Sequence, residues 1–144
     1  MQYSYNYPRM LVTVDSLVFH KGAGNSYKIL LIKRGNPPFE GQYALPGGFP
    51  EMDELLTDAA KRELMEETGL TGINLESLST FDAVNRDPRG RNISVAFYGF
   101  AVHSKVTAGD DASEAQWFPL NSLPPLAFDH KQIIGYAVEM LGLK

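Results

Sequence analysis

The stretch GFPEMDELLTDAAKRELMEETGL, residues 48–70, decides the fold that the rest of the chain completes. Residues 55–68 contain neither Gly nor Pro and are rich in Leu, Ala, Glu, Lys, Met and Arg, which are good helix formers. Gly69 follows directly, and glycine readily takes the left-handed conformation that ends helices. We therefore expect a helix that ends at Thr68.

The expected helix has an apolar face and an acidic face. Three apolar residues spaced four apart form a stripe suited to packing on a sheet: Leu56, Ala60 and Leu64. On the acidic face Glu63, Glu66 and Glu67 stand at i, i+3 and i+4, so their carboxylates converge and repel one another. Lys61 and Arg62 cannot neutralise all three charges. A solvated acidic surface is the alternative, but a hard divalent cation with oxygen ligands would remove the repulsion, and we predict a metal site.

The residues before the helix predict a turn that approaches the same site. Residues 43–48 read as a short strand that runs into a pair of glycines, Gly47 and Gly48. Glycines allow backbone groups to approach a ligand closely, and a turn carbonyl can join a metal shell. Glycine pairs also mark plain tight turns. Beside the acidic helix, we interpret Gly48 as part of the metal site.

Seven residues of this segment stand at fixed spacing: Gly48, Glu54, Arg62, Glu63, Glu66, Glu67 and Gly69. Two apolar residues complete the pattern, Leu64 between Glu63 and Glu66 and Leu70 after Gly69. At ordinary residue frequencies such a match arises by chance on the order of once in 10⁹ starting positions. The pattern resembles, without a departure, the signature G-x5-E-x7-R-E-U-x-E-E-x-G-U of the Nudix hydrolases, in which U is apolar. That family cleaves a nucleoside diphosphate linked to another group and uses divalent metal ions.

The resemblance implies a role for each polar residue of the motif. Glu66 and Glu67 are the expected metal ligands and catalytic residues, followed by Glu63 as a further ligand. Glu54 and Arg62 are expected to support the metal site. The implied cofactor is Mg²⁺, for which Mn²⁺ could substitute.

The general base varies within the family between the helix and a distant loop. In this chain the loop at residues 109–114 is the second source, and Glu114 is its candidate. A base must lie within reach of the proton that it accepts. A plain acidic turn before a strand is an equally good interpretation of Glu114.

The remaining sequence reads as strands closed by a second helix. Apolar and β-branched runs predict strands at residues 11–19, 27–34, 75–84, 93–103 and 115–120. Turn sequences at 22–25 and 87–90 make the first two strands a hairpin and pair the next two. Asp129 can cap a helix that buries Ile133, Ile134, Ala137 and Leu141. These elements predict an α/β fold with a mixed sheet between helices, the α/β/α sandwich that the resemblance also implies.

Length and composition predict one enzyme domain over residues 1–144. The chain has 44% hydrophobic and 21% charged residues, which is ordinary for a globular protein. The absence of cysteine excludes disulfides and thiol catalysis. Residues 1–10 contain no signal-peptide pattern and no run is long enough to span a membrane, so we expect a cytoplasmic protein. A net charge of -4 argues against nucleic acid as a partner. A homodimer is usual among proteins of this kind.

Substrate choice must come from outside the motif. The turn at residues 86–91 holds three cations, Arg86, Arg89 and Arg91, and arginine suits bidentate phosphate contacts. A solvated hairpin tip is the alternative. With the segments 8–15, 81–84, 117–119 and 126–130, this turn resembles the bacterial and archaeal ADP-ribose pyrophosphatase branch. Pro88 lies further beyond the motif than the proline often associated with that activity.

Further substrate contacts are expected from residues near these segments. The candidates for stacking on adenine are Phe39, Phe81 and Phe128, although each could equally belong to the core. Arg34 ends a strand and is a phosphate candidate. His130 is a candidate for the rim of the active site.

Three functions therefore compete. The first is hydrolysis of ADP-ribose to AMP and ribose 5-phosphate, with a small nucleotide as the partner. The second is removal of pyrophosphate from a nucleoside triphosphate. The third is an ADP-ribose-sensing domain of a transcription regulator. We expect the third least, because the sequence ends at Lys144 soon after its last helix and its acidic helix is intact.

Overall fold

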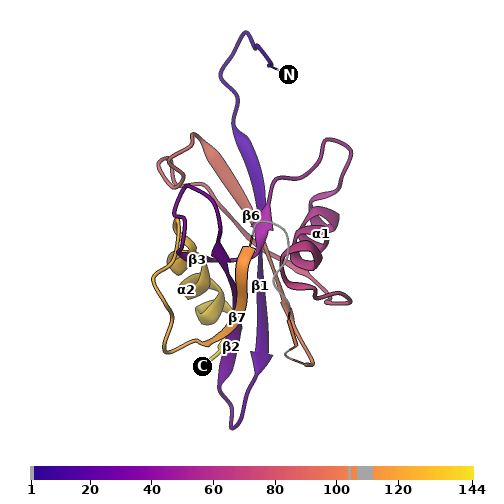
Figure 1. The fold of residues 1–144 in the computed structure, drawn as a ribbon, viewed down its shortest axis with the longest axis vertical. Coiled ribbons are helices and arrows are strands. Elements are labelled where there is room, and N and C mark those ends of the chain that lie inside the picture. The colour runs from indigo at the N-terminus through magenta and orange to yellow at the C-terminus, as the bar shows by residue number, and fades with distance from the viewer. Residues whose placement is uncertain (1, 104, 107–111) are drawn as a thin grey trace.

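The computed structural model describes residues 2–103, 105–106 and 112–144, and it has three layers (Figure 1). A central sheet lies between two helices. In chain order the elements are β1 Leu11–Lys21, β2 Tyr27–Arg34, β3 Tyr43–Ala44, β4 Gly47–Gly48, α1 Leu56–Thr68, β5 Glu76–Phe81, β6 Asn92–Phe100, β7 Ala112–Pro119 and α2 His130–Leu141. The expected α/β fold with a sheet between helices is confirmed.

Strand β1 is the centre of the sheet. The strand order is β3-β2-β1-β6-β5, with β4 also paired to β1 and β7 also paired to β2. β1 runs parallel to β6, with Leu11 opposite Asn92 and Phe19 opposite Phe100. The other described pairings between strands are antiparallel, including the predicted hairpin of β1 with β2 and the predicted pair of β5 with β6. The sheet is therefore mixed, as predicted.

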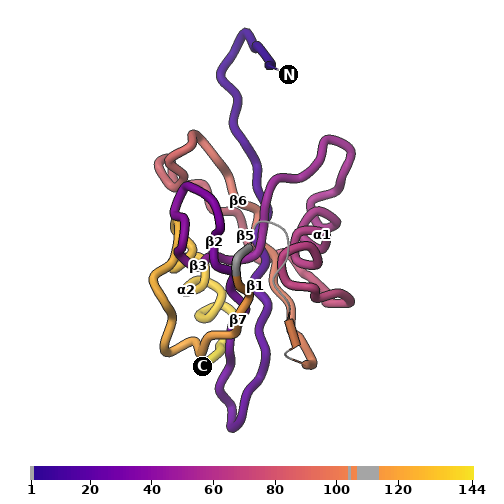
Figure 2. Tube along the Cα trace, in the orientation of Figure 1, coloured from indigo at the N-terminus to yellow at the C-terminus, as the bar shows by residue number. Residues whose placement is uncertain are grey.

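Alternate residues of β1 face the two helices, which cover opposite faces of the sheet (Figure 2). Val14 and Val18 belong to the core beneath α1, whereas Leu17 and Phe19 belong to the core beneath α2. The buried residues that the helices contribute are Ala59, Ala60 and Leu64 from α1 and Ile133, Ile134 and Ala137 from α2. Two apolar cores thus hold the three layers together.

Helix α1 agrees with its sequence prediction except at its beginning. Gly69 ends the helix in the left-handed conformation, with φ of 78°, and its N–H donates to the Met65 carbonyl. Leu56 was expected in the apolar stripe, but it is 36% exposed because the first turn of the helix projects beyond the sheet. Ala59 is buried in its place.

Three other expectations at the ends of elements were wrong. β5 ends at Phe81 and β6 at Phe100, both earlier than predicted, because the chain turns away from the sheet beyond each. Asp129 stands at the N-cap of α2 but makes no side-chain capping bond. Its carboxylate instead accepts hydrogen bonds from the buried guanidinium of Arg86.

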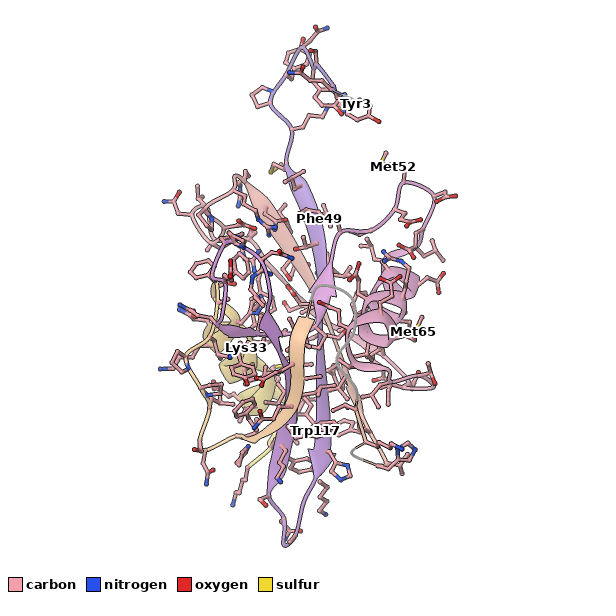
Figure 3. All side chains as sticks on the ribbon, in the orientation of Figure 1. Tyr3, Lys33, Phe49, Met52, Met65 and Trp117 are labelled. Atoms are coloured by element: carbon pink, nitrogen blue, oxygen red, sulfur yellow. The ribbon has the colours of Figure 1, made fainter. Side chains whose placement is uncertain are left out.

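Residues before β1 extend away from the three layers, where Figure 3 labels Tyr3. Tyr3, Tyr5 and Tyr7 are all exposed. Within the described residues, no helix combines the length and apolar character needed to cross a membrane.

The packing of α1 gives a direct stability prediction. Leu64→Ala removes a fully buried side chain and should lower the free energy of unfolding by about 2–5 kcal/mol. Leu56→Ala, on the same face but exposed, should cost less than about 1 kcal/mol. Denaturant unfolding of both variants measures the difference, and equal losses would contradict the observed boundary of the core.

Candidate active site

A cavity of about 400 Å³ is lined by residues of β1, β2, β4, β6, α1, α2 and the segments between them. Eight residues that the sequence singled out line it: Arg34, Gly48, Glu63, Glu67, Arg86, Arg89, Phe128 and His130. Figure 3 labels Phe49, another lining residue, where the chain leaves β4 towards α1. The cavity therefore joins the motif helix to the arginine turn.

The glycine turn and α1 fit together closely. Gly48 pairs with Val14 of β1, and Gly47 pairs with Asp15. A Cβ on Gly47 would lie 2.1 Å from the Val14 carbonyl oxygen, and a Cβ on Gly48 would lie 2.7 Å from the Glu63 carboxyl carbon. Only glycine leaves room for this approach, so the turn needs its two glycines for space.

Glu67 forms the acidic wall of the cavity. Its Oε1 accepts a hydrogen bond of 2.8 Å from the Gly47 N–H. Burial raises the pKa of Glu67 to about 8, and the neighbouring charges of Glu63 and Asp15 add to this effect. Burial also raises the pKa of Glu63. A cation beside these carboxylates would favour their ionised forms.

Arg62 holds the other carboxylates of the motif. Its guanidinium donates to both oxygens of Glu54, at 2.8 and 2.9 Å, and its Nη1 donates to Glu63 at 2.9 Å and Glu66 at 3.2 Å. Hydrogen bonds from Arg62 and from the Glu51 backbone lower the pKa of Glu54 to about 2. Arg62 therefore joins Glu54 to the two carboxylates of the acidic face, and the role of both residues in supporting a metal site stays a prediction.

The donor chemistry of this wall fits a hard divalent cation. In the part of the chain that the structure describes, no three acidic or histidine side chains come close enough to hold a metal ion as they stand. Arg62 engages Glu63 and Glu66, and Glu66 does not line the cavity. The oxygens of Glu63 and Glu67 beside the glycine turn are nevertheless the ligand type that Mg²⁺ or Mn²⁺ prefers. These residues would hold the ion.

Arginines also line the cavity. Arg34 donates from Nε to the Pro38 carbonyl at 2.7 Å, and its guanidinium lies 5.1 Å from the centre of the Phe128 ring. Arg89 lies 5.4 Å from the same ring and donates to both carboxylate oxygens of Asp87. Burial, and then the charge of Arg89, lower the pKa of Arg34. Two cations thus flank one aromatic ring and attract an anion.

The three arginines of the 86–91 turn behave differently. Arg86 is buried and donates to both oxygens of Asp129, at 2.7 and 3.0 Å. Arg91 donates to the Asp82 carbonyl at 2.6 Å and does not line the cavity. Arg89 is the member of the turn that is both partly exposed and at the cavity.

His130 is a buried wall residue, not the rim residue expected from the sequence. Its Nδ1 accepts a hydrogen bond of 3.0 Å from the Leu45 N–H, and its side chain is 4% exposed. Burial lowers the pKa of His130. The ring is therefore neutral near pH 7 and its proton lies on Nε2, which is 3.7 Å from Asp15 Oδ1.

Some predicted residues lie away from the cavity. Glu114 is exposed on β7, where it accepts a hydrogen bond of 2.6 Å from the Tyr43 hydroxyl. Residues 109–111 of its loop lie outside the described part of the chain. Phe81 packs edge-on against Tyr136 of α2, and Phe39 packs against Phe128. Neither ring lines the cavity.

Five polar residues of the cavity were missed as site residues by the sequence interpretation: Thr13, Asp15, Asn36, Asp87 and Asn92. Thr13 and Asp15 stand two apart in the apolar run of β1, and both are buried. Since residues two apart share one face of a strand, this pattern could have marked a polar patch on the sheet.

The NUDIX domain family model matches residues 11–137, and the chain belongs to the Nudix family. An ADP-ribose pyrophosphatase of Methanocaldococcus jannaschii is 51% identical over 107 residues, which cover 74% of this chain and 63% of that protein. The ADPR responsive transcriptional repressor NtrR of Acinetobacter baylyi is 35% identical over 146 residues, which cover 96% of this chain and 57% of that protein. The chain thus spans less than two thirds of the length of these relatives.

A solved structure extends the comparison to the fold. The NUDIX domain of Shewanella oneidensis NrtR complexed with ADP ribose is similar, with a TM-score of 0.88 and 34% identity. The match covers 94% of this chain and 90% of that chain.

The raised pKa of Glu67 predicts how stability depends on pH in metal-free protein. The folded pKa of about 8 lies above the ordinary value of 4.5, so folded protein keeps a proton that unfolded protein loses. The free energy of unfolding should therefore fall as pH rises between these two values. Glu67→Gln should remove this fall and be the more stable protein at pH 8, as thermal unfolding in EDTA would measure. The control is Glu139→Gln at an exposed position, which should keep the wild-type fall. If the free energy of unfolding of Glu67→Gln fell with pH as much as that of the wild type, Glu67 would not be the group responsible.

The ion pair of Arg86 with Asp129 predicts a structural role for this arginine. Arg86→Met leaves the Asp129 carboxylate without its partner and should lower the free energy of unfolding by about 3 kcal/mol or more. Arg91→Met, in the same turn, should lower it by less than about 1 kcal/mol. Denaturant unfolding compares the two variants. Equal effects would show that the Arg86 pair does not hold the turn against α2.

Proposed function

We propose that this chain hydrolyses ADP-ribose to AMP and ribose 5-phosphate in a reaction that depends on a divalent metal ion. The observation that carries the proposal is that acidic and basic side chains line one cavity. Glu63 and Glu67 of α1 line it together with Arg34 and Arg89. A diphosphate has the charge to lie between a cation and these arginines.

The residues of the chain have separate tasks in this reaction. Arg34 and Arg89 attract and orient the diphosphate. The Gly47 N–H holds Oε1 of Glu67, and Arg62 holds Glu63, so that both carboxylates keep a fixed position. A bound divalent cation supplies positive charge against the phosphoryl oxygens.

The base that accepts the proton of the attacking water is proposed to lie on α1. Of the predicted catalytic residues Glu66, Glu67 and Glu114, Glu67 is the one that lines the cavity. A base must lie within reach of the attacking water, which supports Glu67 over the exposed Glu114. The roles of Glu66 and Glu114 stay predictions.

The choice of ADP-ribose rests on the relatives. One is named an ADP-ribose pyrophosphatase, and a similar NUDIX domain is described in complex with ADP ribose. The rings of Phe49 and Phe128, which line the same cavity, support stacking of a base there.

We also propose Mg²⁺ as the metal, which Mn²⁺ could replace. The protein is further proposed to be cytoplasmic and a homodimer, with residues 1–144 as one domain.

Hydrolysis assays test the proposal. Purified protein with Mg²⁺ should release AMP and ribose 5-phosphate from ADP-ribose faster than it cleaves nucleoside triphosphates, NADH or diadenosine compounds. Glu67→Gln should lower kcat by roughly a hundredfold or more, because it removes a charged group from the lining of the cavity. Glu66→Gln should lower kcat to a similar extent if Glu66 is the metal ligand that the motif predicts. The exposed Glu139→Gln on α2 should retain full activity.

Two results would contradict the proposal. If the protein cleaved a nucleoside triphosphate faster than ADP-ribose, the nucleoside triphosphate would be the better candidate substrate. If kcat were unchanged in both Glu66→Gln and Glu67→Gln, α1 would not carry the catalytic residues.

A second candidate is favoured by the similarity to an ADPR responsive transcriptional repressor and to a NUDIX domain complexed with ADP ribose. In that case the cavity would bind ADP-ribose without cleaving it. Calorimetry separates the two functions, since tight binding in Mg²⁺ with no release of AMP would identify a sensor.

A further inference from the structure

Asp15 and His130 meet at the deep end of the cavity. Asp15 is 6% exposed and His130 is 4% exposed, and both line the cavity. Asp15 lies on β1, whereas His130 is the first residue of α2. His130 Nε2 is 3.7 Å from Asp15 Oδ1, which is too far for a direct hydrogen bond.

The other polar atoms of this pair are already engaged. Asp15 Oδ2 accepts a hydrogen bond from the Ser94 hydroxyl, and His130 Nδ1 accepts one from the Leu45 N–H. The ring proton therefore lies on Nε2. Among the described residues, none forms a hydrogen bond to Asp15 Oδ1 or to His130 Nε2. An acceptor and a donor thus face each other without a partner.

Gly47 packs directly against this pair. A Cβ on Gly47 would lie 2.6 Å from Asp15 Oδ1, so any other residue would crowd that oxygen. The group that fits must accept from an N–H and donate to a carboxylate at once. A hydroxyl does both, whereas a phosphate oxygen would be repelled by Asp15.

The Phe128 ring lies beside the pair, with its centroid 5.3 Å from that of the His130 ring, whereas Phe49 is 42% exposed. Phe49 therefore lies nearer to solvent than Asp15 and His130 do, and a flat base finds a stacking surface there. A small, hydroxyl-rich sugar suits the buried polar end.

We propose that Asp15 and His130 are specificity-determining residues that together bind a hydroxyl of the terminal ribose of ADP-ribose. The proposal rests on the proposed function, because it takes ADP-ribose as the substrate. His130 Nε2–H donates to the sugar oxygen, and the sugar hydroxyl donates to Asp15 Oδ1. Selection against substrates without that hydroxyl follows, because its removal leaves two buried polar atoms unpaired.

The test compares each enzyme on ADP-ribose and on analogues that lack the 2- or the 3-hydroxyl of the terminal ribose. The wild-type chain should prefer ADP-ribose over at least one analogue by tenfold or more in kcat/KM. Asp15→Asn should reduce this preference to within about threefold, because the amide oxygen stays with Ser94 and its N–H groups face the sugar. His130→Asn should do the same, since its side-chain oxygen can still accept from Leu45 while the Nε2–H is lost.

The control variant is Ser16→Ala. Ser16 is buried next to Asp15 but lies outside the lining of the cavity, and its hydroxyl has no hydrogen-bond partner among the described residues. This variant should keep the wild-type preference. A second control substrate lacks the 2-hydroxyl of the adenosine ribose, and its disadvantage should be the same in all four proteins.

Several outcomes would overturn the inference while the proposed function stands. Wild-type cleavage of ADP-ribose and both terminal-ribose analogues at equal rates would mean that only water contacts the pair. Equal losses on every substrate in both variants would mean that the pair supports the fold or the reaction instead. A loss of preference confined to the adenosine-ribose analogue would place the other sugar there. Failure of wild type to cleave ADP-ribose would instead remove the proposed function.

A misfolded variant is recognised independently of activity. Thermal unfolding and calorimetric binding of ADP-ribose in EDTA are measured for each protein. If one variant does not fold, the other carries the test, because each removes a different half of the proposed contact.

Discussion

The parallel pairing of β1 with β6 is the interaction on which the site depends. It aligns the two strands from Leu11 opposite Asn92 to Phe19 opposite Phe100, and the β4 turn joins β1 from its other side. Because the strands run in the same direction, their polar beginnings meet at one end of the sheet, where Asp15 accepts from Ser94. The apolar remainder of both strands is buried beneath the helices.

Most charged side chains around the cavity form ion pairs. Arg86 is neutralised by Asp129, and Asp87 by Arg89. Arg62 forms ion pairs with three carboxylates, those of Glu54, Glu63 and Glu66. Burial raises the pKa of Glu67, and the charges of Glu63 and Asp15 add to this effect, whereas the Gly47 N–H and the charge of Arg34 act against it. A cavity that holds buried carboxylates and guanidiniums together suits a cation and an anion bound together.

The proposed hydrolase and the proposed sugar contact use different chemistry in one space. Phosphate recognition relies on charge from Arg34 and Arg89, and it tolerates a partly exposed setting. Hydroxyl recognition relies on paired donors and acceptors that are buried, as Asp15 and His130 are. On these two proposals, the same fold would provide both general attraction to a nucleotide diphosphate and selection of the group that is linked to it.

The sequence by itself determined the elements whose signals are local. Spacing along the chain predicts the helix with its acidic face, its end at Gly69 and the two strand pairs. It also predicts that Glu63 and Glu67 belong to one site. Tertiary structure decided what depends on distant partners. It assigned Arg86 to Asp129, moved Asp129 from capping to an ion pair, and buried His130 against Leu45. It also brought Asp15 to the cavity, because a side chain's role in a buried site is set by neighbours that are far away in the sequence.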